Sequence, residues 1–332
     1  MIRAVLLDKR EIRIEESDPP EIERGKAVIQ VTSNGICGGD MRLYSGKGRV
    51  EKPIVRGHEF AGIIKALGSK TRKLRVGMKV VINPALYCGK CYYCRKSMEH
   101  LCEKMKVFGG AIDGGMQEEL LVPLESIIPL EDSFDLTYGP LIEPTAFAFH
   151  VVNQTHSSNV VVIGLGTIGL LVQQVCKLNK NRVISLDVED YPMTLSRQLG
   201  SDLVLSIKDS DRKEKIEDFL KDEKVDVVFD NVCTPSTLDF ATSIVKNHGR
   251  VVLVGIPSAN IELDKSLMSR ELQIIFKWLY RRKDFNEAVD HILNSTIQYK
   301  PLLSKIFPLR DARDAFEYKL NNPVIKVVLK HG

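Results

Sequence analysis

The sequence of 332 residues contains no apolar run close to the roughly twenty residues that a membrane-spanning helix requires. Its first residues, MIRAVLLDKREIRIEE, alternate in polarity like a β-strand and lack the apolar segment and small-residue cleavage site of a secretion signal. Internal repeats and low-complexity linkers are absent as well. These absences predict a soluble, cytoplasmic protein with no membrane partner.

The chain also has no large excess of charge of either sign: it contains 47 Lys and Arg residues and 43 Asp and Glu residues, for a net charge of +4. This balance gives no reason to expect a nucleic-acid partner. A hydrophobic fraction of 44% and a charged fraction of 27% are ordinary for globular proteins. The length suits two domains, each with a sizeable core.

Cysteine is scarce, with seven in the chain, yet four of them lie together in PALYCGKCYYCRKSMEHLC as Cys88, Cys91, Cys94 and Cys102. Two residues between successive cysteines let a short turn direct several thiolates at one point, which is typical of structural zinc. Disulfides packed this closely belong to small secreted scaffolds. A bacterial ferredoxin run would continue Cys-x3-Cys-Pro, whereas Glu103 follows Cys102 here. The spacing therefore predicts a structural zinc site.

The pattern of residues divides the chain near residue 141. Before it, short β-branched segments at 27–33, 60–66 and 79–83 are separated by glycines, which predicts a β-rich domain of strand and turn. A helical stretch begins at Ile142, and strands then alternate with predicted helices at 167–179, 191–199, 211–221 and 236–245. This alternation predicts an α/β fold with a doubly wound parallel sheet. Further helices are expected around 285–293 and 311–320, before a closing strand, VIKVVLK.

A glycine motif stands at the start of the predicted parallel sheet. Gly164, Gly166 and Gly169 form Gly-x-Gly-x-x-Gly directly after a strand, and Thr167 and Ile168 open the helix that follows. In this context the first glycine makes a tight turn, the second lets the backbone approach a pyrophosphate, and the third lets the helix pack on the strand. The motif predicts a dinucleotide-binding site.

The residues at the end of the next predicted strand indicate which dinucleotide the site binds. RVISLD ends in Asp187, whose carboxylate can accept both ribose hydroxyls of NAD and repels the extra phosphate of NADP. Val188, Glu189 and Asp190 follow, so no Arg is present to receive a 2′-phosphate. The sequence predicts NAD.

A third group of residues has the composition of an open metal site. Cys37 lies in NGICGGD, His58 and Glu59 lie in PIVRGHEFAG, and Glu143 lies in LIEP. One thiolate, one imidazole and one or two carboxylates can hold zinc while leaving a position for water or substrate. Taken singly, such residues are more often structural than ligands.

Together these motifs resemble the zinc-containing medium-chain dehydrogenases, especially the sorbitol (polyol) dehydrogenase branch. The resemblance spans nearly the whole chain and rests on GICGGD, GHEFAG, CGKCYYC, DGGMQEEL, LIEPTAFAFH and VIGLGTIGLL. It implies a GroES-like catalytic domain over 1–142 and 292–332 and a Rossmann NAD-binding domain over 143–291. The structural zinc lobe would occupy 84–104.

The resemblance also implies two zinc ions per chain and hydride transfer from a secondary alcohol to NAD. Cys37 and His58 would hold the catalytic zinc, with Glu59 and Glu143 competing for the third place or one of them acting through water. Backbone groups at Val254 and Gly255 would hold the nicotinamide amide. A homodimer or homotetramer would form through an edge strand near Val251 to Gly255.

One departure from the family pattern concerns the residues that carry away the proton of the alcohol. Relatives usually carry Ser or Thr two residues after the zinc cysteine, and many carry His three residues later; here these positions are Gly39 and Arg42. We expect a water beside Gly39, or Glu59 through a water, to carry the proton. Arg42 forms a surface ion pair or contacts an anionic substrate.

Other functions remain open from the sequence alone. Simple alcohols or threonine-like compounds are alternative substrates, and the missing relay residue gives some support to a non-enzymatic relative. A zinc-free quinone reductase is disfavoured, because the chain has both the cysteine lobe and the Cys37–His58 pair.

Overall fold

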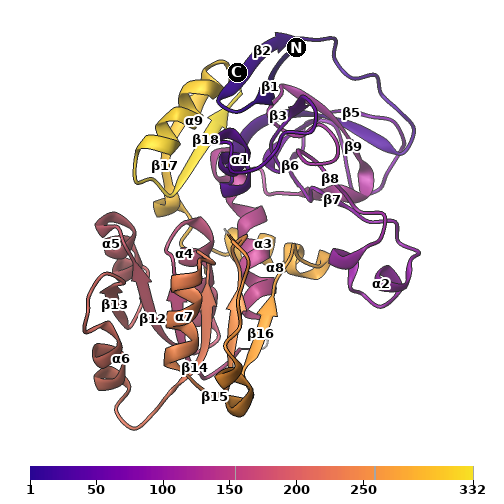
Figure 1. The fold of residues 1–332 in the computed structure, drawn as a ribbon. Coiled ribbons are helices and arrows are strands. Elements are labelled where there is room, and N and C mark those ends of the chain that lie inside the picture. The colour runs from indigo at the N-terminus through magenta and orange to yellow at the C-terminus, as the bar shows by residue number, and fades with distance from the viewer. Residues whose placement is uncertain (154, 258, 332) are drawn as a thin grey trace. The chain divides into compact units, whose positions relative to one another are not determined.

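The computed structural model describes residues 1–153, 155–257 and 259–331, and the chain forms two compact units (Figure 1). The first unit contains Met1–Ala146 together with the chain from Tyr280 onward, and the second contains Phe147–Leu279. Among the described residues, none of the helices combines the length and the apolar character that crossing a membrane requires.

The first unit is built on a seven-stranded sheet of order β10-β6-β5-β3-β18-β17, in which β9 also pairs with β3. A three-stranded sheet, β2-β1-β4, and the pair β7-β8 complete its strands. The strands are β1 (Ile2–Asp8), β2 (Glu11–Glu16), β3 (Lys26–Gly35), β4 (Ile54–Val55), β5 (Glu59–Leu67), β6 (Lys79–Ile82), β7 (Ala85–Leu86), β8 (Lys106–Val107), β9 (Glu119–Pro123), β10 (Ile127–Pro129), β17 (Leu303–Pro308) and β18 (Lys326–Lys330).

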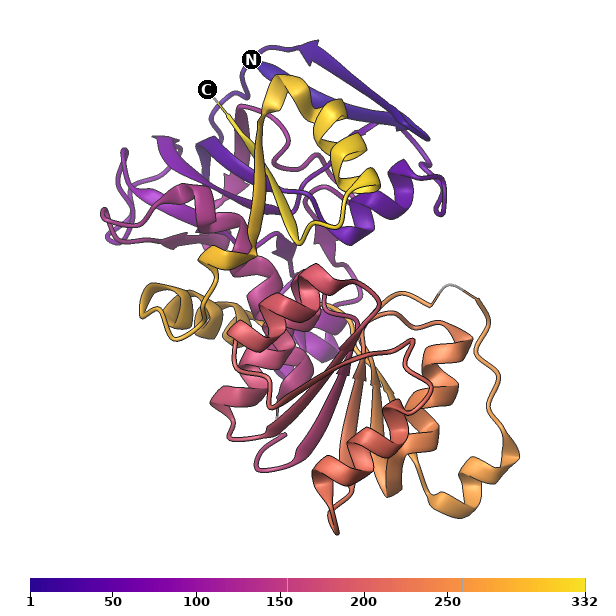
Figure 2. The same ribbon diagram turned by 90° about the vertical axis from the view of Figure 1, so that its left-hand side faces the viewer.

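Residues from opposite ends of the sequence lie together in this first unit. The closing segment, yellow in Figure 2, lies beside the indigo N-terminal strands, because β18 pairs antiparallel with β3 and α9 contacts β2. The helices are α1 (Gly38–Tyr44), α2 (Tyr92–Arg95), α8 (Arg282–Leu293) and α9 (Ala312–Asn321), while α3 (Ile142–Val152) runs from the first unit into the second.

Helix α1 corrects the prediction that this part of the chain is only strand and turn. The Asp40 carboxylate accepts a hydrogen bond from the Cys37 N–H at 3.0 Å, and the Cys37 sulfur accepts one from the Gly39 N–H at 3.4 Å. Together these bonds form a capping box that starts the helix. Gly38 and Gly39 hid this helix from the sequence analysis, because glycine has a low helix propensity.

The chain returns to the first unit at Tyr280, whereas the sequence predicted that it returns at residue 292. The Tyr280 ring packs on Phe285 of α8 with ring centroids 5.7 Å apart, and the Tyr87 hydroxyl donates to the Tyr280 carbonyl at 3.3 Å. Helix α8 is therefore tied to the β-rich unit by contacts between segments that are far apart in the sequence.

The second unit confirms the predicted Rossmann-type fold. Its six-stranded parallel sheet has the order β13-β12-β11-β14-β15-β16, and the strand order reverses next to β11, where the glycine motif begins. β11 is β-branched and almost wholly buried, as expected of a parallel strand covered on both faces. Its strands are β11 (Asn159–Ile163), β12 (Arg182–Asp187), β13 (Leu203–Ser206), β14 (Val225–Asp230), β15 (Val245–Leu253) and β16 (Gln273–Phe276), and its helices are α4 (Thr167–Leu178), α5 (Asp190–Gln198), α6 (Arg212–Leu220) and α7 (Pro235–Ile244).

The edge of this sheet differs from the prediction. The strand near Val251 to Gly255 is β15, which lies inside the sheet, and β16 forms the edge beyond it. β16 has only four residues and follows a 3₁₀ turn, so it produced no recognisable strand pattern.

A buried histidine predicts how the stability of the fold depends on pH. His331, which follows β18, is 5% exposed, and burial lowers the pKa of its imidazole to about 4. In the unfolded chain the imidazole titrates near pH 6.5, so between these values the unfolded state binds more protons and stability falls as the pH falls.

We expect this residue to lower the free energy of unfolding by about 2 kcal/mol between about pH 7.5 and about pH 5. Urea unfolding of the wild type and of a His331→Leu variant at both pH values measures the effect. The variant should lose correspondingly less stability on acidification, and equal losses in the two proteins would contradict the assignment of a neutral buried imidazole.

Candidate active site and metal centres

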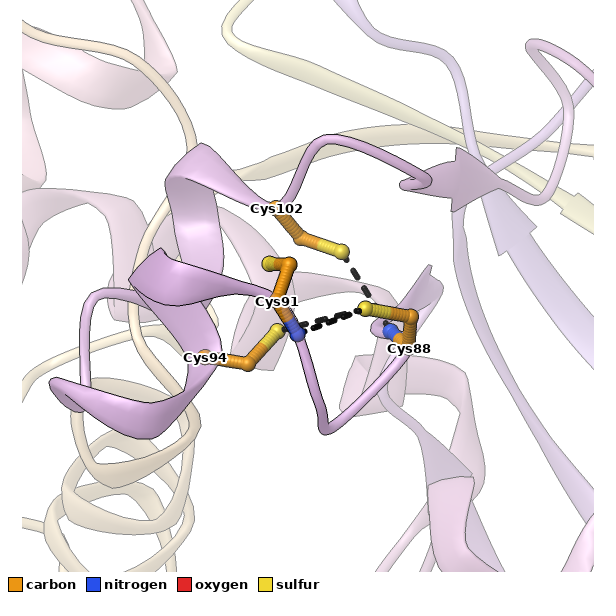
Figure 3. A group of neighbouring side chains, drawn as sticks. All are labelled: Cys88, Cys91, Cys94 and Cys102. Carbon is orange, nitrogen blue, oxygen red and sulfur yellow. Dashed lines mark hydrogen bonds between the residues drawn. The ribbon is translucent and has the colours of Figure 1, made fainter.

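The four clustered cysteines converge on one point in the first unit (Figure 3). Their sulfur atoms all lie within 4.8 Å of one another, and the Cys88 and Cys94 sulfurs are 3.9 Å apart. A tetrahedron with Zn–S bonds of 2.3 Å has edges of about 3.8 Å, so the arrangement fits zinc. All four cysteines are free thiols rather than disulfides.

Backbone N–H groups donate hydrogen bonds to these sulfurs and favour the negatively charged thiolate form that binds a cation. The Cys88 N–H donates to the Cys102 sulfur at 3.3 Å, and the Cys91 N–H donates to the Cys88 sulfur at 3.4 Å. Backbone donors at Lys90 and Cys91 lower the pKa of Cys88 to about 6, whereas burial raises the pKa of Cys94 to about 12. Because neighbouring thiolates repel one another, the group needs a positive ion to ionise completely.

A second group of donors is assembled by the main sheet of the first unit. Cys37 caps helix α1 just beyond the end of β3, and His58 and Glu59 stand at the start of β5. β3 and β5 pair antiparallel with Gly35 opposite Glu59, which brings the two segments together. The sulfur, one imidazole nitrogen and one carboxylate oxygen lie within 4.8 Å of one another. Zinc binds sulfur, imidazole nitrogen and carboxylate oxygen, so this set of donors suits it.

Glu143 lies close to this group but is not part of it. It stands in the first turn of α3, where it is buried, and its negative charge helps to raise the pKa of His58. Burial raises the pKa of Glu143 to about 7, while the positive charge of His58 opposes that rise. Of the two carboxylates that the sequence left in competition, the geometry thus brings Glu59 nearer to the Cys37 and His58 donors.

The electrostatic surroundings of His58 are strongly negative. Burial by itself would lower the pKa of its imidazole, but Cys37, Asp40 and Glu143 outweigh burial and raise the pKa well above its ordinary value. An environment that favours a positive charge on the imidazole also favours a metal cation beside it.

Two charged residues near this group were missed by the sequence analysis. Asp40 is fully buried, and besides holding the Cys37 N–H it accepts a hydrogen bond from Arg56 Nε at 3.0 Å. Lys326 Nζ donates to both carboxylate oxygens of Glu59, at 2.7 and 2.6 Å. The only sequence signal for Lys326 was a lysine inside an apolar strand, VIKVVLK.

The position of Gly39 is open. A Cβ atom there would meet only the Cys37 sulfur, at 3.9 Å. Packing therefore does not require glycine at this position, and the space that a relay hydroxyl would occupy is available.

Each of the three glycines of the motif in the second unit has a different environment. Gly164 has φ +83°, and a Cβ there would lie 2.6 Å from a methyl group of Val232. A Cβ at Gly169 would clash with the Gly164 carbonyl, so helix α4 packs closely on the turn. A Cβ at Gly166 would meet nothing within 4 Å, which leaves room beside the backbone for a ligand.

Asp187 stands at the end of β12 and organises this turn. Its carboxylate accepts hydrogen bonds from the N–H groups of Leu165 at 2.5 Å, Val188 at 2.7 Å and Glu189 at 3.0 Å. Thr167 and Ile168 begin α4 beside it. At the expected nicotinamide contact, the N–H groups of Val254 and Gly255 both donate to the Asp230 carbonyl, so a contact there would have to use their carbonyl oxygens.

Two family models match the chain, one in each part. "Alcohol dehydrogenase GroES-like domain" matches residues 23–132, and "Zinc-binding dehydrogenase" matches residues 167–294.

Similar proteins match over nearly the full length. The chain is 27% identical over 341 residues to the sorbitol dehydrogenase of Bacillus subtilis (strain 168), covering 99% of this chain and 97% of that protein. It is 30% identical over 307 residues to the L-idonate 5-dehydrogenase (NAD(P)(+)) of Escherichia coli (strain K12), covering 88% and 87%. The crystal structure of rspB, an alcohol dehydrogenase of E. coli CFT073 in complex with NADH, superposes with a TM-score of 0.92, at 28% identity and 99% coverage of both chains.

The geometry of the cysteine lobe predicts its metal content. Replacing Cys102 by Ser removes one of four thiolates, and we expect a loss of about one zinc ion per chain after dialysis, measured by atomic absorption. Cys176→Ser is the matched control, because Cys176 is a buried cysteine on α4 and belongs to neither donor group. A Cys102→Ser protein with the wild-type zinc content would contradict the assignment.

Proposed function

We propose that this chain, which belongs to the zinc-containing medium-chain dehydrogenase family and to its sorbitol dehydrogenase-like branch, transfers a hydride from a secondary alcohol to NAD and forms a ketone. The substrate is a polyol, a sugar alcohol or a related hydroxy compound. The observation that carries the proposal is the grouping of Cys37, His58 and Glu59 donor atoms within 4.8 Å of one another, in a chain with relatives named as sorbitol and L-idonate dehydrogenases.

We assign the residues of the two metal sites as follows. Cys37, His58 and Glu59 hold the catalytic zinc, and Glu143 acts through a water, since its carboxylate lies outside the group of three. Cys88, Cys91, Cys94 and Cys102 hold the structural zinc, which gives two zinc ions per chain. A reducing compartment such as the cytoplasm keeps the five cysteine ligands available by keeping their thiols reduced.

The residues of the chain have separable roles in this reaction. When bound, zinc supplies the Lewis acidity that lowers the pKa of an alcohol hydroxyl, and the nicotinamide accepts the hydride. Asp40 fixes the loop that carries Cys37 through the hydrogen bonds to the Cys37 N–H and to Arg56. The proton of the alcohol leaves through a water in the open space beside Gly39, in place of the hydroxyl that relatives carry.

The dinucleotide is NAD rather than NADP. Asp187 ends β12 with its carboxylate beside the glycine turn, where a negative charge accepts ribose hydroxyls and repels a 2′-phosphate. Helix α5 then begins with Asp190, and no cation stands between the two acids. A phosphate on the ribose would therefore meet negative charge on both sides.

The active form is an oligomer, a homodimer or homotetramer. β16 is the outer strand of the sheet, with no strand paired on its far side among the described residues, and Phe276 at its end and Trp278 just after it are 64% and 60% exposed. An edge of this kind can pair with its own copy about a two-fold axis.

The test of the proposed function is NADH formation with a panel of polyols, sugar acids, threonine and simple alcohols, with zinc measured on the same sample. We expect turnover of a polyol or sugar-derived alcohol, two zinc ions per chain, and a kcat/KM at least about tenfold higher with NAD than with NADP. Turnover restricted to simple alcohols or threonine would move the assignment to those substrates. NAD binding with no turnover of any compound would indicate a non-enzymatic relative.

A Gly39→Ser variant tests the proposed proton path. Because the position is open, we expect the variant to fold normally, with turnover and its pH profile unchanged or slightly impaired, since water already carries the proton. Steady-state turnover measured across a range of pH values decides this. An increase of about tenfold or more would show that the wild type lacks an efficient path.

A further inference from the structure

Lys326 and Glu59 form a bidentate ion pair that is almost completely shielded from solvent. Lys326 Nζ lies 2.7 and 2.6 Å from the two carboxylate oxygens, and both side chains are 2% exposed. Each oxygen of Glu59 thereby accepts one hydrogen bond and keeps a second lone pair for another partner.

The sheet builds this pair across its central strand. Glu59 starts β5 and Lys326 starts β18, and these two strands flank β3 on opposite sides. Gly35 of β3 is paired with Glu59 on one side and with Val328 on the other. A Cβ atom at Gly35 would clash with Oε2 of Glu59, so the carboxylate reaches Lys326 only because this position has no side chain.

The same register brings Lys326 beside the second anionic donor. The N–H of Ile36 donates to the Val327 carbonyl at 3.0 Å, so the neighbouring residues Cys37 and Lys326 stand next to each other along the two strands. Lys326 thus bonds directly to one of the three grouped donors and stands in register with a second, Cys37.

A gain in stability alone does not explain a buried ion pair beside these donors. Buried ion pairs contribute little net stability compared with well-packed apolar side chains, because both charges must be removed from water. A ligand carboxylate, by contrast, needs a second partner that fixes its orientation, and such partners strongly affect metal affinity.

We propose that Lys326 is a positioning residue of the metal centre: it holds the Glu59 carboxylate toward Cys37 and His58 as the third ligand and compensates part of the negative charge of the two anionic ligands. The inference rests on the proposed catalytic zinc site and not on the identity of the alcohol. Gly35 is part of the same arrangement, because its lack of a side chain leaves the space through which Glu59 reaches Lys326.

The experiment compares the affinity of the second metal site in the full-length protein and three variants. Zinc bound per chain is measured across a series of zinc-buffered solutions, and the absorption spectrum of the Co²⁺-substituted protein reports the catalytic ligand field. We expect Lys326→Met to weaken the second zinc about 10- to 100-fold while the cysteine-lobe zinc stays bound. Lys326→Arg should restore most of the affinity, since it keeps a donor with a positive charge.

Lys79→Met is the matched control, since Lys79 begins β6 and its Nζ donates to the Phe134 carbonyl at 2.7 Å rather than to a metal donor. It should keep both zinc ions with the wild-type affinity. Gly35→Ala provides an independent test if Lys326→Met does not fold. It keeps both charges but displaces the carboxylate, so it should also weaken the second zinc selectively.

Wild-type affinity and an unchanged Co²⁺ spectrum in both Lys326→Met and Gly35→Ala would overturn the inference and leave the pair a purely structural one. A wild type that binds only the lobe zinc would overturn it as well. A wild type that binds two zinc ions but oxidises no alcohol would instead refute the proposed function, and the comparison of affinities would still decide the role of Lys326.

Discussion

The pairing of β3 with its neighbours is the constraint on which the candidate active site depends. β3 carries Cys37 just beyond its end, β5 on one side begins with Glu59, and β18 on the other begins with Lys326. A shift of one residue in either register would turn alternate side chains to the opposite face and separate the thiolate from the carboxylate. The antiparallel ladder therefore sets the geometry of the proposed zinc ligands.

The two proposed metal centres differ in how their donors are brought together. The cysteine lobe draws its four sulfurs from residues 88–102, so a turn, the short helix α2 and local N–H donors are enough to assemble it. The second centre draws on residues 37, 58 and 59 and is supported by Lys326 from the far end of the chain. Local sequence specifies the first, whereas the second exists only in the folded sheet.

The alternation of strands and helices made the second unit predictable, since β11, α4 and β12 follow the hydrophobic pattern closely. The errors fell where local patterns were weak or misleading. Helix α1 was missed because two glycines stand between the cysteine and the aspartate that make its cap, and β16 because it is short. The boundary at Tyr280 depends on a contact with Tyr87, which is distant in the sequence, so no local pattern contains it.

The sequence by itself determined the fold class, the family, the four-cysteine group and the glycine turn, because each depends on spacing within a short segment. It named Cys37, His58, Glu59 and Glu143 but left the two carboxylates equivalent. The tertiary structure treats them differently: it groups the donor atoms of Glu59 with those of Cys37 and His58 and pairs Glu59 with Lys326, while Glu143 is not in that group. The reason is physical: burial and charge pairing are set by neighbours that are distant in the chain, and a linear pattern does not specify them.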